Sequence, residues 1–500
     1  MRILRAARVA ALFLFCCSVA SAQMVTLSAK EGDLIFEGRV LGYDGRYFRL
    51  ETVYGEVTID GDEVTCVGNG CPTSSENMIR VRISGTQSAT SVLLPALVES
   101  FALRNGYAFA RVTQDATHFS YALVDGETGA SLIEIGFRVS SSGEGFVDLL
   151  VDEADLVASL RPIRPGEAQL EAEAGRGDLT QPGRARILAL DAVVPVVSPE
   201  SSLPAITFRE LIDAYSDPKA TRAVHSLARG SGAFELFVDR ALSPEGLDPT
   251  DRIVFHQSVA DLRAALIGDP DAIGLTALSE ASGLRPVPLV SSCLMTYDTS
   301  PTSLKSGDYP LVAPVHLYSP ARRLPPILQD FLAYLDSPAA QVVVQRARFV
   351  DQQPDLIPLA QQGARLAVAI TQAGPEVPLP DLQTIIRDLA GYQRLSVTFL
   401  FDEDGNAFTT QSHEALKRLS KQINQGAFAD RMILLTGHTA SEGRFQDNRA
   451  KSIALAEQVK EALGVDREIA LMGVGEALPR SCEDTAIGRS QNQRVEVWIR

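Results

Sequence analysis

From residue 79 to about residue 215 the chain alternates strands with helices, and this alternation constrains its fold more than any other feature. Apolar stretches predict strands at residues 79–84, 108–112, 146–151 and 186–197. Residues 90–104 show an amphipathic helical pattern, and residues 207–215 predict another helix with Thr207 as its N-cap. Such alternation is typical of an α/β fold with a largely parallel sheet. Because 500 residues are too many for one core, we expect roughly two to four domains.

The N-terminus has the features of an export signal. Arg2, Arg5 and Arg8 precede an apolar run over residues 9–19, and the small residues 20–22 form a cleavage site. We therefore expect a signal peptide at residues 1–22 and a mature chain that begins near Gln23. Cys16 lies inside the apolar run, as does its neighbour Cys17, so both are expected to be removed rather than lipidated. No later stretch has the roughly 20 apolar residues of a membrane-spanning helix, so we expect a soluble mature protein.

Residues 23–77 predict a small β-unit. Short alternating stretches fill residues 25–72, and turn residues at 43–45 and 54–55 separate them as in hairpins. A partly open barrel is one form that such a unit can take. We expect the aromatic residues Tyr47 and Phe48 to belong to its core.

Four cysteines remain after removal of the signal. Cys66 and Cys71 flank a short glycine-containing loop, and an oxidising compartment favours their pairing as a disulfide. A zinc site at these two residues would need further ligands that the nearby sequence lacks. Cys293 and Cys482 belong to different predicted domains, and the sequence leaves open whether they pair across an interface or stay as buried thiols.

Several stretches of residues 78–351 resemble the phosphate-binding proteins of ABC transporters, in the order and spacing of that family. The stretches are residues 83–88, 153–162 with Glu167, 193–197, 228–237, 271–274 and 309–311. The resemblance implies a two-lobed periplasmic-binding-protein fold of type II, with residues 193–197 as the crossover strand between the lobes. It also implies capture of a small anion such as phosphate.

Three of these stretches carry the residue types that an oxyanion site needs. Helix N-termini offer free backbone N–H groups and a positive dipole end, hydroxyls add donors, and arginine adds charge. We therefore assign the candidate anion ligands as Thr86, Gln87, Ser88, Ser159, Arg161, Arg229, Ser231 and Gly232. The alternative is structural, because hydroxyl residues at helix starts are ordinary caps and glycines serve turns.

Two positions depart from the phosphate-binding pattern. Ala233 stands where the third loop usually has a hydroxyl, and Leu160 stands near the place of an aspartate that accepts a hydrogen bond from the protonated anion. These departures make selectivity for phosphate doubtful. The alternative function is a non-transport envelope scaffold whose solute cleft has degenerated.

The last hundred residues resemble the OmpA-like domain, which ties Gram-negative envelope proteins to peptidoglycan. The landmarks are residues 437–439 (GHT), Gly443, Asn448, Ser452, residues 473–476 (GVGE) and the closing pattern at 488–496. We assign residues 392–500 to this α+β domain and residues 352–391 to a linker with helices at 359–372 and 382–389. The resemblance implies a location in the periplasm and an attachment at the outer membrane or cell wall.

The charged clamp that such domains use for peptidoglycan is missing. The family pattern places an aspartate at Ala440 and an arginine at Leu455, and together these bind the diaminopimelate side chain. We therefore expect weakened wall binding. The remaining candidate contacts are Thr439, Asn448, Arg489, Asn492 and Arg494. Under the structural alternative, Asn492 and Arg494 fasten the last strand, and His438 is a scaffold residue.

Composition limits the other functions. A net charge of −16 argues against nucleic acid as a partner. The six histidines are scattered without metal-ligand spacing, and Ser231 lies outside a nucleophile motif, so we expect no enzyme activity, no cofactor and no metal site. The expected partners are a small anion, peptidoglycan, and outer-membrane or transporter proteins.

Overall fold

The structure is a computed structural model of the chain, and it describes residues 24–72, 78–293, 295–372, 376–401 and 407–500. The predicted export signal lies outside these residues. The chain forms two compact units, one that ends at Ile79 and one that runs from Arg80 to Arg500. The second unit holds both the predicted solute-binding part and the predicted C-terminal domain. Within the described ranges, every helix is too short or too polar to cross a membrane.

The first unit is a five-stranded antiparallel sheet in the order β4-β3-β2-β1-β5. Its long strand β2 pairs with β1 along its first half and with β3 along its second half. Tyr47 and Phe48 are buried, as expected from the sequence. The predicted disulfide between Cys66 and Cys71 is confirmed, with 5.7 Å between the two Cα atoms. The strands are β1 (Met24–Ala29), β2 (Ile35–Tyr43), β3 (Tyr47–Thr52), β4 (Gly55–Asp60) and β5 (Val64–Val67).

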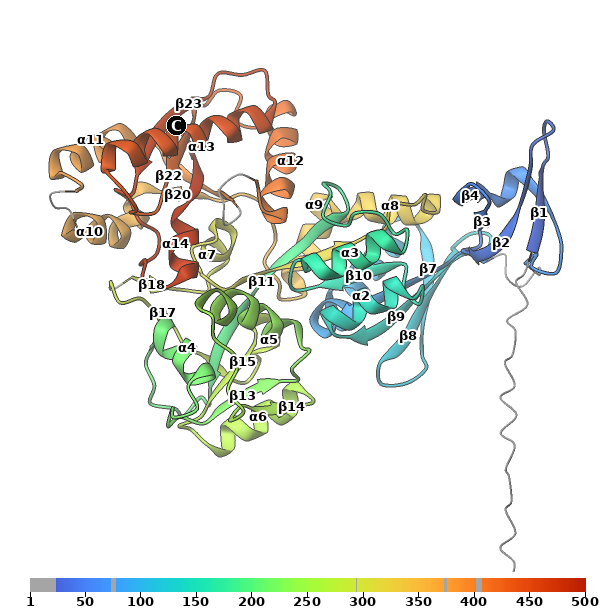
Figure 1. The fold of residues 1–500 in the computed structure, drawn as a ribbon, viewed down its shortest axis with the longest axis horizontal. Helices are drawn as coiled ribbons and strands as arrows, with labels where there is room; N and C mark the ends of the chain where they lie inside the picture. The colour runs from blue at the N-terminus through green and yellow to red at the C-terminus, as the bar shows by residue number, and fades with distance from the viewer. Residues whose placement is uncertain (1–23, 73–77, 294, 373–375, 402–406) are drawn as a thin grey trace, which may run out of the picture. The chain divides into compact units, whose positions relative to one another are not determined.

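The central part of the second unit has two lobes built on one continuous sheet (Figure 1). The first lobe contains β6 (Arg80–Thr86), β7 (Tyr107–Thr113), β8 (His118–Asp125), β9 (Ser131–Ser140), β10 (Leu156–Ser159), α1 (Leu94–Arg104), α2 (Ser142–Leu150), α3 (Pro165–Glu173), α8 (Pro326–Leu335) and α9 (Pro338–Arg346). The second lobe contains β12 (Ile206–Thr207), β13 (Val224–Leu227), β14 (Val254–His256), β15 (Ile273–Ala277), β16 (Arg285–Pro286), β17 (Leu289–Val290), β18 (Thr296–Tyr297), α4 (Phe208–Ser216), α5 (Gly232–Phe237), α6 (Val259–Gly268) and α7 (Pro301–Ser306).

Two long strands join the lobes. The first part of β11 (Ala185–Val197) pairs with β19 (Val312–Tyr318), and its last residues pair with β15 in the second lobe. Residues 193–197, predicted as the crossover, are this last part of β11. The α/β class and the two-lobed core that we expected are thereby confirmed. The prediction of a largely parallel sheet is wrong, because among the described strands only β6 and β13 pair in parallel with both of their neighbours, whereas the pairings of β11 with β19 and of β7 with β8 are antiparallel.

Local signals placed most helices correctly, with one error. Thr207 caps α4 in a capping box with Glu210, as predicted. The strand predicted at residues 146–151 is wrong, because these residues lie in and just after α2. Ser141 and Glu144 form a capping box that starts this helix, and Phe146 and Leu149, three residues apart, bury the same face.

The C-terminal part is a five-stranded sheet in the order β20-β21-β24-β22-β23, with only β22 and β23 parallel. The segment predicted as a linker contributes β20 and two helices to this part. Its elements are β20 (Leu356–Pro358), β21 (Gln393–Leu400), β22 (Ile433–His438), β23 (Ala470–Gly475), β24 (Arg494–Ile499), α10 (Gly363–Gln372), α11 (Leu379–Leu389), α12 (Thr410–Asn424), α13 (Phe445–Leu463) and α14 (Ala486–Asn492).

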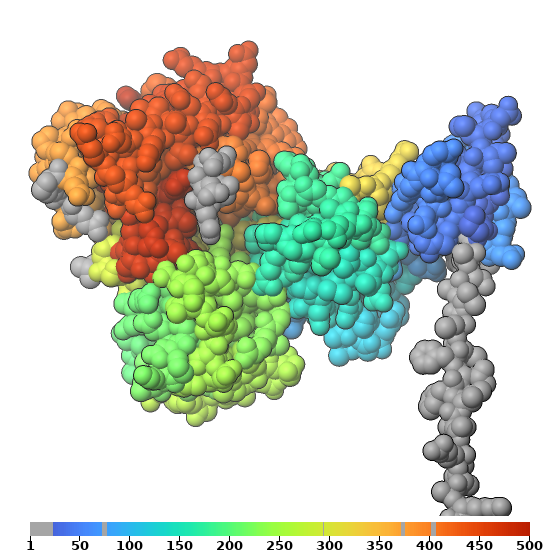
Figure 2. Space-filling view, in the orientation of Figure 1, coloured from blue at the N-terminus to red at the C-terminus, as the bar shows by residue number. Residues whose placement is uncertain are grey.

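The C-terminal part packs directly against the second lobe (Figure 2). Cys293 and Cys482 form a disulfide that joins them, which answers the question that the sequence left open. The Tyr297 and Ser481 hydroxyls lie 2.8 Å apart near this disulfide, and the Glu245 carboxylate accepts a hydrogen bond from the Ala486 N–H at the start of α14. The second lobe and the C-terminal part are therefore connected covalently as well as by packing.

Candidate functional site

Three predicted ligand loops meet at the junction between the lobes. A Cβ atom placed on Gly232 would lie 2.9 Å from the Leu160 Cβ, 3.0 Å from the Thr86 Oγ1 and 3.1 Å from the Ser142 Oγ. Gly232 begins α5 in the second lobe, whereas the other three residues belong to the first lobe. The lobes thus touch where the sequence predicted an anion, and the space beside Gly232 does not admit a methyl group without displacement.

Some hydroxyl groups at this junction already form hydrogen bonds within the protein. The Ser142 Oγ accepts a hydrogen bond from the Leu160 N–H, and the Ser159 Oγ is held by the Arg161 backbone. Ser88 is buried, and its hydroxyl has no hydrogen-bond partner within the described part of the chain. Gln87, also predicted as a ligand, is exposed at the start of the first helix.

The predicted anion ligand Arg161 is fully buried and paired with two carboxylates. Its Nη2 lies 2.7 Å from Glu167, and its Nε lies 3.1 Å from Glu235 on α5. Burial by itself would lower the pKa of Arg161, but the hydrogen bonds to Glu167 and the charge of Glu235 outweigh burial and raise it. Because Glu235 belongs to the second lobe, this pair bridges the lobes.

A second ion pair lies beside the first and also crosses the junction. Arg164 at the start of α3 contacts Asp239 at 2.9 Å and reaches Glu235 at 3.5 Å. Burial raises the pKa of Glu235, and the nearby arginines offset this effect only in part. Arg161 and Arg164 therefore face three carboxylates, and the junction has no surplus positive charge for an anion.

The remaining predicted ligands of the third loop have other contacts. Arg229 is exposed, and its guanidinium stacks over Phe255 with Asp251 at 3.9 Å, both in the second lobe. Ser231 caps α5 by accepting a hydrogen bond from the Phe234 N–H. Ser231 is therefore an ordinary helix cap, as the structural alternative predicts.

The two departures from the phosphate-binding pattern are both buried at the junction. Leu160 is 2% exposed and Ala233 is 3% exposed, and Leu160 packs against the start of α5. Sequence reasoning missed Ser142, Glu235 and Asp239. Glu235 lies inside the third loop, residues 228–237, so the sequence already showed a carboxylate that could pair with the predicted arginines.

Two of the predicted wall-contact residues serve the scaffold. The Asn492 Oδ1 accepts hydrogen bonds from the Arg480 and Ser481 N–H groups, and its Nδ2 donates to the Ser481 carbonyl. Arg494 is fully buried against Glu496 at 2.8 Å. Arg489 donates to the Glu483 carbonyl.

The other wall-contact candidates are buried as well. Thr439 and Asn448 are less than 9% exposed, and the Thr439 Oγ1 and Asn448 Nδ2 have no hydrogen-bond partner of ordinary geometry among the described residues. Leu455 belongs to the hydrophobic core of the C-terminal part, with Ala456 and Val459. An arginine at this position would therefore enter an apolar core.

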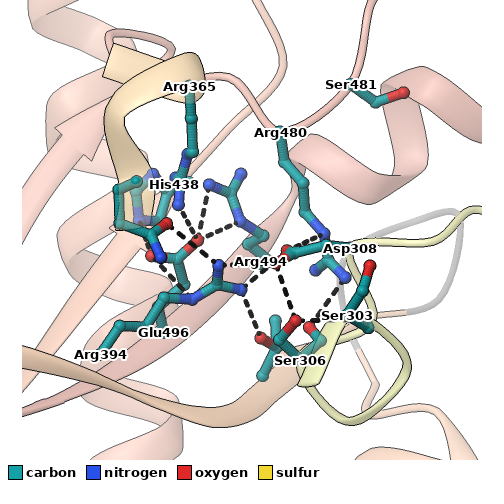
Figure 3. A network of polar contacts seen from close by, with 12 residues as sticks. Ser303, Ser306, Asp308, Arg365, Arg394, His438, Arg480, Ser481, Arg494 and Glu496 are labelled. Carbon is teal, nitrogen blue, oxygen red and sulfur yellow. Dashed lines mark hydrogen bonds and ion pairs between the residues drawn. The ribbon is translucent and has the colours of Figure 1, made fainter. Parts of the chain in front are cut away.

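A cluster of buried ionic groups lies where the C-terminal part meets the second lobe (Figure 3). Glu496 on β24 contacts Arg365 and Arg494 at 2.8 Å each, and Arg394 at 3.6 Å. Asp308, from the second lobe, contacts Arg394 at 2.9 Å and Arg480 at 3.1 Å. We call these six residues the interface cluster.

The surrounding arginines determine the pKa values of the two carboxylates in the interface cluster. Burial by itself would raise the pKa of Glu496 and of Asp308. The surrounding guanidinium groups outweigh this effect and hold both pKa values well below the usual range. Burial lowers the pKa of Arg480 to about 10, because Asp308 compensates it only in part. The cluster therefore holds four guanidinium groups against two carboxylates.

The residues that the structure describes contain no group of three histidine, cysteine or acidic side chains arranged to hold a metal ion. No protein-family model matches the chain. No curated protein matches it either.

Solved structures of bacterial binding proteins are similar to the central part of the chain. An ABC-type phosphate transport receptor from Vibrio cholerae is 15% identical over 54% of this chain and 99% of its own, with a TM-score of 0.39. A putative phosphate ABC transporter substrate-binding protein with bound phosphate from Clostridium perfringens is 15% identical over 55% of this chain and 100% of its own, with a TM-score of 0.40. A possible phosphate binding protein from Planctomyces limnophilus DSM 3776 is 16% identical over 59% and 99%, with a TM-score of 0.36.

Proposed function

We propose that this protein is an exported envelope scaffold in which the two-lobed core acts as a closed platform rather than as a solute carrier. The observation that carries the proposal is the set of side chains that fill the junction between the lobes. Leu160 packs against Gly232, and Arg161 is bound by Glu167 and Glu235. Apolar packing and an internal ion pair thus lie where the sequence predicted an anion, which supports the proposal.

The physical argument rests on charge and on space. A buried anion needs several free donors or a net positive surrounding. Here both arginines are neutralised by carboxylates of the same protein, and a methyl group would already clash beside Gly232. Closure therefore does not require a ligand.

The proposal also concerns the place of the protein in the cell. We infer a periplasmic location from the signal sequence, and an attachment near the cell wall through residues 392–500. The oxidised pairs Cys66–Cys71 and Cys293–Cys482 support an extracytoplasmic compartment. Because Asn492 and Arg494 hold the scaffold and Thr439 and Asn448 are buried, wall contact would depend chiefly on Arg489.

Calorimetry and small-angle scattering test the scaffold proposal. The native protein should give no heat with phosphate, sulfate or small organic phosphates, and its radius of gyration should not change. The double variant Leu160→Ser and Ala233→Thr should gain anion binding, because it replaces apolar groups with donors. Leu170→Ser, at an exposed position of the first lobe, is the matched control. Stoichiometric binding and compaction of the native protein would overturn the proposal.

A second candidate function is capture of a small anion such as phosphate. It is favoured by one observation: Thr86, Ser88 and Ser142 place hydroxyl groups near helix starts at the junction, and the Ser88 hydroxyl has no partner among the described residues. The calorimetry above distinguishes the two functions. Heat with the native protein that disappears in Thr86→Val would support capture.

A further inference from the structure

Two histidine rings face each other at the edge of the second lobe. His225 on β13 and His256 on β14 belong to neighbouring parallel strands, and His256 lies opposite Leu227 in their register. The two histidines are therefore diagonal neighbours on the same face of the sheet. Strand β14 is the last strand at this end of the sheet (Figure 1). The pair thus connects the edge strand to the rest of the lobe.

The two rings meet through one nitrogen each. The His225 Nδ1 and the His256 Nε2 lie 2.9 Å apart, and the two ring planes are inclined by 19°. A hydrogen bond between them needs one nitrogen that carries a proton and one that has a free lone pair. In the tautomer of His225 that carries its proton on Nε2, both facing nitrogens have a lone pair. The same geometry therefore offers either a hydrogen bond or two nitrogen ligands.

The spacing of the two nitrogens suits a shared metal ion. With metal–nitrogen bonds of roughly 2.0–2.1 Å, a right angle at the metal places two imidazole nitrogens about 2.9 Å apart, and a tetrahedral angle places them about 3.3 Å apart. The observed separation of 2.9 Å matches the right angle, which is the angle of square-planar copper(II). Both rings must turn toward the ion, and the broad terminal torsion of histidine allows this at low cost.

The surroundings of the pair suit a cation as well. Burial lowers the pKa of His225, the His256 ring lowers it further, and the carboxylate of Asp269 at the end of α6 raises it. No arginine or lysine of the described residues contributes to this shift, so the nearby charge that acts on the ring is negative. Both histidines are half-buried, which leaves one side of the pair open to water.

We propose that His225 and His256 bind a divalent transition-metal ion, copper(II) most tightly, and that this ion clips the edge strand β14 to β13. The His225 Nδ1 and the His256 Nε2 would be the protein ligands. Water would fill the other positions, because the described residues place no third histidine, cysteine or acidic ligand there. Copper(II) is favoured over zinc(II) by the right angle and by its higher affinity for nitrogen ligands.

The site does not depend on the proposed function, because none of the junction contacts described above involves either histidine. Sequence reasoning missed it for a simple reason. The two residues are 31 positions apart, so no metal-ligand spacing along the chain joins them. The parallel pairing of β13 and β14 brings them together.

Calorimetry on the full chain at neutral pH tests the proposal, with Cu²⁺ alone as the probe. The native protein should bind one ion at this pair, and electron paramagnetic resonance should show two coordinated nitrogens. His225→Gln and His256→Gln should each weaken binding roughly tenfold or more, since loss of a ligand costs at least as much as loss of a group that orients one. His118→Gln is the matched control, because His118 lies in the first lobe and contacts Asp115. It should bind like the native protein.

Melting temperatures and a double variant separate one shared site from two weak ones. Cu²⁺ should raise the melting temperature of the native protein but not that of His256→Gln, and both should melt alike without the ion. The variant that combines His225→Gln with His256→Gln should lose little more affinity than either single change, because a shared ion needs both rings.

Three results would overturn the proposal. They are absence of binding in the native protein, native affinity in either single variant, and two separate sites that are each removed by one change. Tighter binding of Zn²⁺ than of Cu²⁺ would overturn the assigned metal.

Discussion

The junction between the lobes and the interface cluster are both built from arginines and carboxylates, yet they differ in charge balance and in covalent support. The junction sets two arginines against three carboxylates, and Arg164 and Asp239 remain 41% and 31% exposed. The interface cluster sets four arginines against two carboxylates. Arg394, Arg494 and Glu496 are fully buried, whereas Asp308 is 34% exposed.

A covalent bond distinguishes the two contacts more clearly than exposure does. Separating either contact would leave a fully buried arginine without a partner from the other side, Arg161 at the junction and Arg394 in the interface cluster. The Cys293–Cys482 disulfide lies on the same side as the interface cluster. We therefore infer that the second lobe and the C-terminal part move as one body, and that any opening occurs at the junction.

The largest effect is expected from Glu496→Gln. This change leaves Arg365 and Arg494 without their carboxylate in a buried place, which should cost about 3–5 kcal/mol of the free energy of unfolding. Urea unfolding provides the measurement. Glu457→Gln, on the exposed face of α13, is the control. A loss equal to that of the control would mean that Glu496 does not stabilise the C-terminal part through these arginines.

The paired change Cys293→Ser and Cys482→Ser should come next. The disulfide closes a loop across 189 residues, and its removal should cost about 2–4 kcal/mol. Limited proteolysis should then release the C-terminal part more readily. Cys66→Ser with Cys71→Ser, which opens a separation of only 5 residues, should cost less. Equal losses in the two pairs would contradict the interface role of the long-range bridge.

Glu235→Gln should affect the junction rather than the interface cluster. It removes the carboxylate that reaches Arg161 from the second lobe, while Glu167 still holds Arg161. We expect a smaller loss than for Glu496→Gln, because burial raises the pKa of Glu235 and disfavours its charged form, and we expect faster hydrogen exchange at the start of α5. Asp213→Asn, which alters an exposed pair on α4, is the control. Unchanged exchange at α5 would show that packing alone keeps the lobes closed.

The pH dependence should also distinguish the two regions, by about 1 kcal/mol. Burial raises the pKa of Asp191, on the crossover strand β11, to about 6. A carboxyl group with a raised folded pKa is more stable protonated, so its contribution falls as the pH rises from about 4 to 6. Acidification from pH 7 to 5 should therefore stabilise the native protein more than Asp191→Asn.

The interface cluster should not respond over this pH range. The pKa values of Asp308 and Glu496 are depressed, so their contribution is present above the unfolded pKa and is lost only at a lower pH. Thermal melts at pH 5 and pH 7 provide the test. Asp308→Asn should not change how the melting temperature depends on pH between pH 5 and pH 7. A change as large as that of Asp191→Asn would contradict the depressed pKa of Asp308.

The sequence determined the features that depend on neighbouring residues. Strand and helix alternation, the Thr207 cap and the Cys66–Cys71 pair were predicted correctly, because each arises from contacts within a few residues. The error at residues 146–151 also arises from contacts within a few residues. A short apolar run fits a strand or a buried helix, and the Ser141–Glu144 capping box, overlooked in the sequence, selects the helix.

The tertiary structure decided which distant residues meet. Arg161 looked like an anion ligand in its own loop, but Glu235, 74 positions away, neutralises it. Leu455 matched a recognition position by its spacing, but it packs in the core of the C-terminal part. The pairing of Cys293 with Cys482 was likewise open until the structure brought them together. The spacing of residues along the sequence indicates the local conformation. The burial of a side chain and the identity of its charge partner depend instead on how separate elements pack.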